Sequence, residues 1–267
     1  MSRFRDEHPA DADLLVADIG NTALTVGTVV GGEVTHAHSV PPAQADALGD
    51  VLVSLWGQLD ASRPRRFVVG SVVPDTLVRL CKAAARYLDQ TPLVVAEAIS
   101  LPMPVAVAQP DRVGVDRVCC AAAAYETLGH ACVVADFGTA VTIDLISDDG
   151  EFLGGTIAPG LGLAATALAE HTAALPIVEL RVPDGPVGGD TEAAIRAGIV
   201  YGAVGLLREV TTRFAEKIGR WPTLIATGGD AELVADQAGI VDRVVPNLCL
   251  RGLALAYRLE AASADDA

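Results

Sequence analysis

The sequence predicts an α/β protein made of two duplicated halves with a cleft between them. One observation is that VADIGNTALTV (residues 16–26) and VADFGTAVTI (residues 134–143) share a single frame once Asn21 is set aside. Another is that each copy continues with a Gly-Glu pair and further strand-like residues. Copies so far apart in the chain indicate duplication of a whole domain rather than a short-period repeat. We therefore expect one acidic glycine turn to face the cleft from each side.

Stretches rich in β-branched residues alternate with stretches of strong helix formers along both halves. The first half predicts, in chain order, strands over 14–20, 23–30 and 33–40, a helix over 46–59, a strand over 66–73, a helix after Pro74, a strand over 91–96 and a helix over 115–129. The second half predicts strands over 131–138, 140–147 and 151–158, helices over 165–175 and 191–219, a strand over 222–227, a helix after Gly228-Gly229 and a helix over 248–262. The prolines within 99–112 exclude a helix there.

Composition predicts a soluble globular protein. The 267 residues are 51% hydrophobic and 20% charged, which allows a sizeable core and excludes disorder. Gly, Pro or charge interrupts the apolar runs well before the roughly 20 residues that a membrane helix needs. The polar start lacks the apolar core of a secretory signal. We therefore expect a cytoplasmic protein that spans no membrane, with loose polar ends.

The formal net charge of the chain is −15. A field of this sign repels nucleic acid and anionic membrane surfaces, so neither is expected as a partner. It also repels the phosphates of a nucleotide. A phosphate site in this chain must therefore be built locally, from backbone N–H groups, a few basic residues and bound cations.

The five cysteines and five histidines are scattered along the chain. The cysteines form no CxxC pair and stand among apolar residues, so we expect free thiols in the core rather than reactive or metal-binding ones. His36 and His38 alternate on a predicted strand without a nearby acid or thiol at ligand spacing. They are expected to face solvent rather than to share a metal.

In the first copy, DIGNT, a strand delivers Asp18 to the mouth of the cleft. Gly20 has no Cβ, so the backbone there can approach a phosphate closely. Asn21 and Thr22 add amide and hydroxyl donors, and Asp18 would hold a cation or ordered water beside the phosphate. An ordinary tight hairpin is the alternative for a single copy, but two matching copies favour a ligand site.

The second copy supplies the same groups, because Asp136 with neighbouring carbonyl groups makes an oxygen-rich cation site and the Thr139 hydroxyl group can reach a phosphate oxygen. A third element is VGVDRVCC, in which Asp116 and Arg117 stand at the start of an Ala-rich helix. Asp116 could simply cap this helix. The functional interpretation makes it a general base for a substrate hydroxyl group, with Arg117 holding an anionic substrate group. Neither a P-loop nor a GxGxxG motif occurs.

This ordered set of motifs resembles the type III pantothenate kinases, within the superfamily of acetate and sugar kinases, heat-shock ATPases and actin. The resemblance runs from about residue 14 to residue 257 and is carried by DIGNT (18–22), GVDR (114–117), DFGTAVTID (136–144), LGGTIAPG (153–160), HTAALP (171–176), TEAAIRAG (191–198) and TGGDAELVA (227–235). It implies two duplicated actin-like (ribonuclease H-like) domains, over 13–125 and 126–262, after a disordered tail over 1–12.

The resemblance also implies a role for each matching position. ATP would contact Asp18, Ile19, Gly20, Asn21, Thr22, Ala23, Leu24, Thr25 and Thr139. Pantothenate would contact Val107, Gly114, Val115, Asp116, Arg117 and Thr191, with Asp116 accepting the proton of its primary hydroxyl group. Asp136 would bind a monovalent cation, K⁺ or NH₄⁺, and Mg²⁺ would accompany ATP. The implied enzyme is a homodimer that phosphorylates pantothenate to 4′-phosphopantothenate, the first step of coenzyme A biosynthesis.

Two other functions stay open on the sequence alone. One is a non-catalytic regulatory or accessory protein on the same fold, against which intact Asp18, Asp116 and Thr139 argue. The other is a kinase for another small hydroxy acid, because family members often have a tyrosine where this chain has Val107.

Three further features are undecided by sequence. Asp144 could lie near the cation or at a strand end. Gly228-Gly229 could approach adenosine or form a packing turn. His171 is expected to pack or to hydrogen-bond within its helix rather than to perform chemistry.

Overall fold

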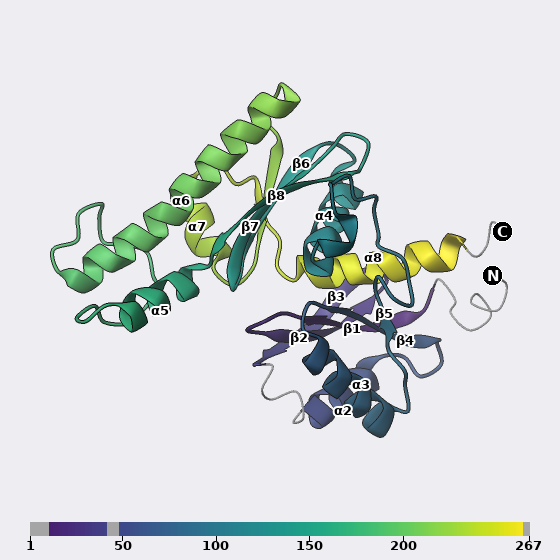
Figure 1. Ribbon diagram of the computed structural model, residues 1–267. Coiled ribbons are helices and arrows are strands. Elements are labelled where there is room, and N and C mark those ends of the chain that lie inside the picture. The colour runs from purple at the N-terminus through teal and green to yellow at the C-terminus, as the bar shows by residue number, and fades with distance from the viewer. Residues whose placement is uncertain (1–10, 42–47, 264–267) are drawn as a thin grey trace. The chain divides into compact units, whose positions relative to one another are not determined.

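The structure is a computed structural model that describes residues 11–41 and 48–263 (Figure 1). It forms two compact units. The first contains the described residues up to Glu126 and those from Asn247 onward, and the second is Thr127–Pro246. Most of the polar tail expected over 1–12 lies outside the described residues.

The first unit is built on a five-stranded sheet with the strand order β3-β2-β1-β4-β5. The first three strands form an antiparallel meander, and β4 and β5 add to it in parallel. The strands are β1 (Asp13–Ile19), β2 (Leu24–Val30), β3 (Glu33–Val40), β4 (Arg65–Ser71) and β5 (Leu93–Val94). The central strand β1 is buried almost throughout, as expected of a strand covered on both faces.

Helices cover both faces of this sheet, because alternate residues of a strand point to opposite sides. On one face, α2 (Gly49–Gln58) and α3 (Pro74–Leu88) share a core with Leu15, Val26 and Val69. On the other face lies α8 (Leu248–Ser263; Figure 1). There Leu250 lies against Gly27 and Leu253 against Gly70. Helix α4 (Val115–Leu128) packs closely on α8 in turn: a Cβ at Gly252 would collide with the carbonyl of Cys119.

The second unit repeats this plan. Its sheet has the order β10-β9-β6-β7-β8, again a meander with two parallel strands added. The strands are β6 (Cys132–Phe137), β7 (Ala140–Ile146), β8 (Phe152–Pro159), β9 (Thr223–Thr227) and β10 (Arg243–Val244). The helices are α5 (Leu161–His171), α6 (Thr191–Ile218) and α7 (Ala231–Ala238), and the main core lies between the sheet, α6 and α7.

Strand for strand, the two sheets have the same order and directions, so the predicted duplication of an α/β unit is confirmed. The long helix predicted over 191–219 is confirmed as α6, which begins after Asp190, whose side chain accepts from the Ala193 N–H group, and ends at Gly219 in the left-handed region. Such caps are strong start and stop signals. In the described part of the chain, no helix is both long and apolar enough to cross a membrane.

Some boundaries differ from the sequence expectations. Helix α5 spans Leu161–His171 instead of 165–175, so it starts directly after Gly160 and ends before the HTAALP motif is complete. Strand β5 has two residues instead of six. A short 3₁₀ turn, η2 (Pro110–Arg112), interrupts the segment expected to have no helix; proline is tolerated there because it opens the turn. The start of the helix predicted over 46–59 lies partly outside the described residues.

Helix α8 packs against β1 and β4 and is therefore part of the first unit. The sequence had grouped it with the second half, over 126–262. Its apolar composition predicts that it is buried, but composition carries no information about which sheet it covers. As limits of independently folding domains, 13–125 and 126–262 stay predictions.

Candidate active site

The first acidic glycine turn closes the hairpin between β1 and β2. The Gly20 N–H group donates to the Ala23 carbonyl at 2.9 Å, so the turn is tight. Asp18 is half-buried next to the last residue of β1, whereas Asn21 and Thr22 are exposed. The turn thus exposes Asn21 and Thr22 to solvent close to a half-buried carboxylate.

Asp116 stands in the first turn of α4, between half-buried Gly114 and Arg117. Its Oδ1 accepts a hydrogen bond from the backbone N–H of Arg117 at 2.8 Å. A Cβ at Gly114 would collide with this same oxygen, so glycine is what allows the carboxylate to fold back on the helix start. Asp116 therefore satisfies one of the N–H groups left over at a helix N-terminus, and its second oxygen is left for other chemistry.

The start of α4 lies beside the Asp18 turn within the first unit: a Cβ on Gly114 would stand 3.6 Å from Val72, whose N–H group donates to the Ile19 carbonyl at 3.1 Å. The Asp18 and Asp116 carboxylates both act on the pKa of the buried Cys119 thiol. The hydrogen bond with Cys249 lowers the pKa of Cys119, but burial, Cys120 and the two carboxylates together raise it more. The link is tertiary: Asp18 lies near the end of β1, Asp116 lies in the first turn of α4, and α8, which carries Cys249, packs against both elements.

The second acidic glycine turn joins β6 to β7. Asp136 is half-buried, and Gly138 and Thr139 are exposed. Three backbone hydrogen bonds hold this turn: Gly138 N–H to Ala140 at 3.1 Å, Gly160 N–H to Thr139 at 3.0 Å and Asp230 N–H to Phe137 at 3.1 Å. The donors of the last two belong to the LGGTIAPG and TGGDAELVA motifs, and their role in holding this turn is not visible in the sequence.

The remaining predicted contact residues are distributed over both units. Val107 is half-buried in a bend ahead of η2 in the first unit. Thr191 is exposed at the first residue of α6 in the second unit. The first unit thus carries residues 18–25, Val107 and GVDR, and the second carries Asp136, Thr139 and Thr191.

The features that the sequence left undecided are now placed. Asp144 is buried inside β7, where it pairs with Val134 rather than lying at the exposed turn. Gly228 packs against the second turn, which supports the packing interpretation. His171 is the exposed last residue of α5.

The expected burial of the cysteines is confirmed for four of the five, and the expected exposure of His36 and His38 is confirmed for both. The cysteines are free thiols, and four are buried: Cys119, Cys120, Cys132 and Cys249. His36 and His38 are exposed on β3. Among the residues the structure describes, no three histidine, cysteine, aspartate or glutamate side chains are grouped so as to hold a metal ion.

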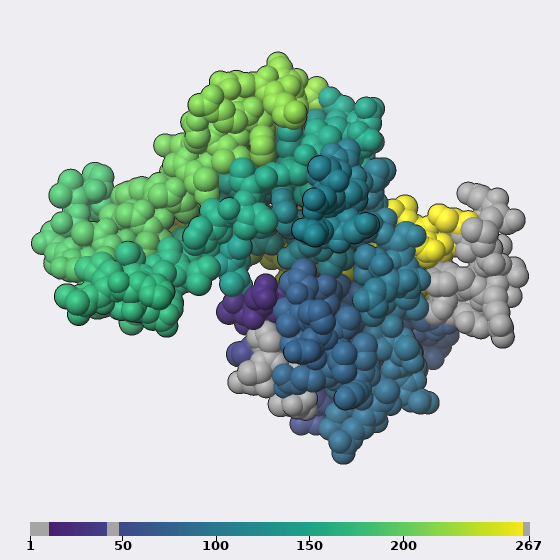
Figure 2. Space-filling view, in the orientation of Figure 1, coloured from purple at the N-terminus to yellow at the C-terminus, as the bar shows by residue number. Residues whose placement is uncertain are grey.

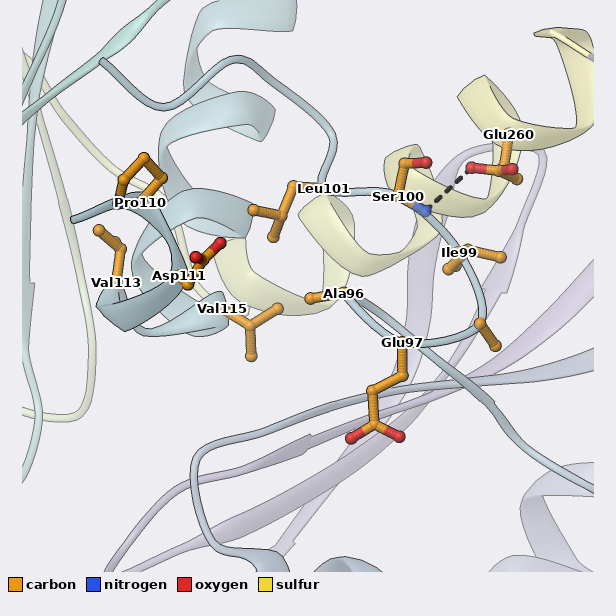
Figure 3. A pocket seen from close by; sticks show the side chains of 11 residues that line it. Ala96, Glu97, Ile99, Ser100, Leu101, Pro110, Asp111, Val113, Val115 and Glu260 are labelled. Carbon is orange, nitrogen blue, oxygen red and sulfur yellow. Dashed lines mark hydrogen bonds between the residues drawn. The ribbon is translucent and has the colours of Figure 1, made fainter. Parts of the chain in front are cut away.

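A pocket of about 460 Å³ lies beside the start of α4 (Figure 3). Val113 and Val115 border it, and Glu97, Asp111 and Glu260 add three carboxylates to its lining. The Ser100 N–H group donates to Glu260 at 2.9 Å and ties the loop after β5 to α8. A pocket so acidic repels anionic ligands.

Two like α/β units, each with an acidic glycine turn after its first strand, define the actin-like fold of sugar kinases and related ATPases. A ROK-family glucokinase from Streptomyces griseus, solved with glucose and AMPPNP, has a TM-score of 0.50 at 15% identity, covering 94% of this chain and 100% of that chain. A protein from Campylobacter jejuni described as a Baf-family transcriptional activator has a TM-score of 0.56 at 20% identity, covering 89% and 94%. At these identities the likeness shows the fold alone.

The family is shown by sequence. A profile of the type III pantothenate kinases matches residues 14–213. The type III pantothenate kinase of Moorella thermoacetica is 39% identical over 249 residues, which cover 91% of this chain and 98% of that protein. That of Dehalococcoides mccartyi is 35% identical over 259 residues, covering 95% and 98%. The chain belongs to the type III pantothenate kinase family, and the resemblance drawn from its motifs is confirmed.

Proposed function

We propose that the protein is a pantothenate kinase that transfers the γ-phosphoryl group of ATP to the primary hydroxyl group of pantothenate. The product is 4′-phosphopantothenate, and the reaction is the first step of coenzyme A biosynthesis. Family membership supports the substrate. The observation on the fold that carries the proposal is that the helix start with Asp116 lies beside the turn of Asp18: a Cβ on Gly114 would stand 3.6 Å from Val72, whose N–H group donates to the Ile19 carbonyl.

Asp116 acts as the general base. One of its oxygens is held by the Arg117 N–H group, so the carboxylate is fixed in orientation and the other oxygen receives the proton of the attacking hydroxyl group. Phosphoryl transfer needs positioning and charge neutralisation more than covalent help from the protein. Arg117 and the N-terminus of α4 supply positive potential for the carboxylate of the substrate.

The phosphates of ATP lie against the turn of residues 18–25, with Thr139 contributing its hydroxyl group. The exposed residues of the first turn, Asn21 to Ala23, offer donors to phosphate oxygens. Mg²⁺ arrives with ATP and neutralises part of the charge that develops on the phosphates. Because the whole chain carries a net charge of −15, this local neutralisation is what allows the nucleotide to bind.

A monovalent cation binds at Asp136. The residues fit such an ion, because the half-buried carboxylate stands beside the carbonyl groups of an exposed turn. One carboxylate with carbonyl oxygens suits a weakly held hard cation, whereas a transition metal would require several side-chain ligands. K⁺ or NH₄⁺ is the ion that we assign to this position.

The protein acts as a homodimer in the cytoplasm. The first half of α6 exposes small residues (Ala194, Gly198, Gly202 and Gly205), and a Cβ added to any of these glycines would meet open space. Close by in the chain, Val187 is 85% exposed and Ile177 68% exposed. Figure 2 shows the surface that α5 and α6 present on this face of the second unit, in green. Exposed apolar surface of this kind is typical of a protein–protein interface.

This chain has Val107 where family members often have a tyrosine, so another small hydroxy acid stays open as the acceptor of the phosphoryl group. A coupled assay of ADP release with ATP, Mg²⁺ and K⁺, run with and without pantothenate, decides between them. The proposal expects pantothenate-dependent ADP and a product with the mass of 4′-phosphopantothenate. ADP release that responds to a different hydroxy acid instead would overturn the substrate. No turnover with any acceptor would favour a non-catalytic regulatory protein on the same fold.

A further inference from the structure

The turn that carries Asp136 and Thr139 is enclosed by the backbone of two glycines from other parts of the second unit. The first is Gly160, between β8 and α5. Its N–H group donates to the Thr139 carbonyl at 3.0 Å, and a Cβ on it would collide with the carbonyl oxygens of both Gly138 and Thr139. Only glycine lets the backbone pass so near, because any larger residue must push the turn away.

The second glycine is Gly228, directly after β9. Its φ of +96° lies in the region that favours glycine. A Cβ on it would lie 2.5 Å from Oδ1 of Asp136 and 2.5 Å from the Phe137 carbonyl oxygen. Two residues later, the Asp230 N–H group donates to that same carbonyl at 3.1 Å. The backbone of this segment therefore limits where the Asp136 carboxylate can point.

The first turn, in the duplicated half, is built differently. It also receives one backbone hydrogen bond from the neighbouring parallel strand, because the Val72 N–H group donates to the Ile19 carbonyl at 3.1 Å. Gly70 stands opposite Asp18 as Thr227 stands opposite Asp136, so the counterpart of Gly228 is the next residue, Ser71, which is not a glycine. Among the described residues, a glycine whose added Cβ would meet the acid of the turn is found at the second turn and not at the first.

We propose that Gly160 and Gly228 are positioning residues of the kinase. By lacking a Cβ, they let two backbone segments close on the β6–β7 turn and hold the Asp136 carboxylate and Thr139 in one arrangement. The inference rests on the proposed function, because the aligned groups are those assigned to the cation and to ATP. Neither glycine touches the reacting atoms, so both act through Asp136 and Thr139.

Five alanine variants test this: two probes and three controls. Gly160→Ala is the cleaner probe, since the φ of Gly160 is −64° and the collision is the only cost; Gly228→Ala adds backbone strain. Gly162→Ala and Gly229→Ala are the matched controls, because these glycines lie two residues after Gly160 and one after Gly228, and a Cβ added to either meets open space. Gly27→Ala, which crowds the His36 carbonyl at 2.5 Å in the first unit, controls for lost stability without contact with the turn.

Two quantities are measured for each variant: the rise in melting temperature on replacing Na⁺ by K⁺ in the absence of substrates, and the K⁺ concentration that gives half-maximal kinase activity. In Gly160→Ala and Gly228→Ala the K⁺ concentration should rise about 10- to 100-fold, as for residues that orient a metal ligand, and the K⁺-induced shift should shrink. The KM for pantothenate should stay near the wild-type value. Gly162→Ala, Gly229→Ala and Gly27→Ala should keep the wild-type K⁺ response, the last at a lower melting temperature.

The outcomes separate the inference from the proposed function. If the wild-type protein does not phosphorylate pantothenate, the proposed function is wrong. If it does so without any response to K⁺, the cation site is wrong, and the positioning role is wrong with it. A wild-type K⁺ response in folded Gly160→Ala and Gly228→Ala overturns the positioning role alone. If Gly160→Ala does not fold, the K⁺ response of Gly228→Ala tests the positioning role by itself. Asp136→Asn gives the K⁺ response expected when the cation site is lost completely.

Discussion

The carboxylate of Asp116 accepts a hydrogen bond from the backbone N–H of Arg117, 2.8 Å away, at the start of α4. A helix cap and a general base are therefore not exclusive roles here: one oxygen stabilises the helix start and the other stays available. The two roles nevertheless respond differently to substitution, because asparagine can still accept the backbone hydrogen bond but cannot take a proton.

Asp116→Asn should lower kcat by about 10²- to 10⁴-fold, since the general base is lost. The variant should keep its fold and, within about 1 kcal/mol, its free energy of unfolding, because the cap is retained. Steady-state kinetics and urea unfolding measure the two effects. The control is Asp111→Asn, an exposed acid five residues earlier, which should keep wild-type kcat. Near-wild-type turnover in Asp116→Asn would rule out the general-base role.

Replacing K⁺ by Na⁺ at constant ionic strength should lower the activity of the wild-type protein, because the site proposed at Asp136 is assigned to K⁺ or NH₄⁺. Asp136→Asn should raise the K⁺ requirement about 10- to 100-fold. Kinase activity measured across a titration of each salt tests this. Asp149→Asn, an exposed acid in the turn after β7, should behave as wild type. An enzyme indifferent to the identity of the monovalent ion would contradict the site.

Val107→Tyr should lower the KM for pantothenate and change kcat only slightly. A tyrosine at this position restores an aromatic wall and a hydroxyl group for the substrate while leaving Asp116 unchanged. The KM gain expected from one added hydrogen bond is about 2- to 10-fold. Val105→Tyr is the matched control, two residues earlier in the same segment. A higher KM in Val107→Tyr would mean that the pocket has been reshaped for a different acid.

Alkaline pH should destabilise the protein partly through Cys132. Burial raises the pKa of this thiol from 9.0 to about 12. Between these values the unfolded chain releases the proton and the folded chain does not, so stability present below pH 9 is lost as pH rises towards 12. Urea midpoints at about pH 8 and about pH 10.5 should therefore differ less in Cys132→Ala than in wild type. Equal losses in both proteins would show that other groups carry the effect.

Gly202→Glu should convert the proposed homodimer to a monomer. The new charge would stand in the exposed small-residue face of α6, where a closely packed partner helix leaves no room for it. Glycine is a poor helix former, so this change favours the helix itself by a few tenths to about 1 kcal/mol, and dissociation could not be ascribed to unfolding. Light scattering coupled to gel filtration measures the mass. Thr212→Glu, exposed further along α6, is the control; a Gly202→Glu dimer would place the interface elsewhere.

Local patterns predicted most of the fold. Strands β1 to β3 and β6 to β8 followed from alternation and glycine turns, because neighbouring strands of a meander pair through short connections. Helix α6 was predicted to within a residue, because Asp190 and Gly219 mark its ends. The start of α5 was missed because Gly162 weakens the helical pattern there, although packing of Leu161 in the core overrides it.

The positions of Asp18, Asp116, Asp136 and Thr139 at the ends of elements were also readable from sequence. Their surroundings were not. That α8 closes over β1 and β4, or that Gly228 limits the direction of the Asp136 carboxylate, depends on residues far apart in the chain.

The sequence by itself determined the duplicated α/β plan, the two acidic glycine turns and the family, because each is written in short segments with a fixed spacing. The tertiary structure decided which sheet α8 covers, that Asp18 and Asp116 share the surroundings of one buried thiol, and that the second turn is enclosed by Gly160 and Gly228. Such contacts depend on how closely two backbone segments approach each other. A glycine in the sequence indicates that a close approach is possible, because it has no side chain, but it does not indicate which segment makes that approach.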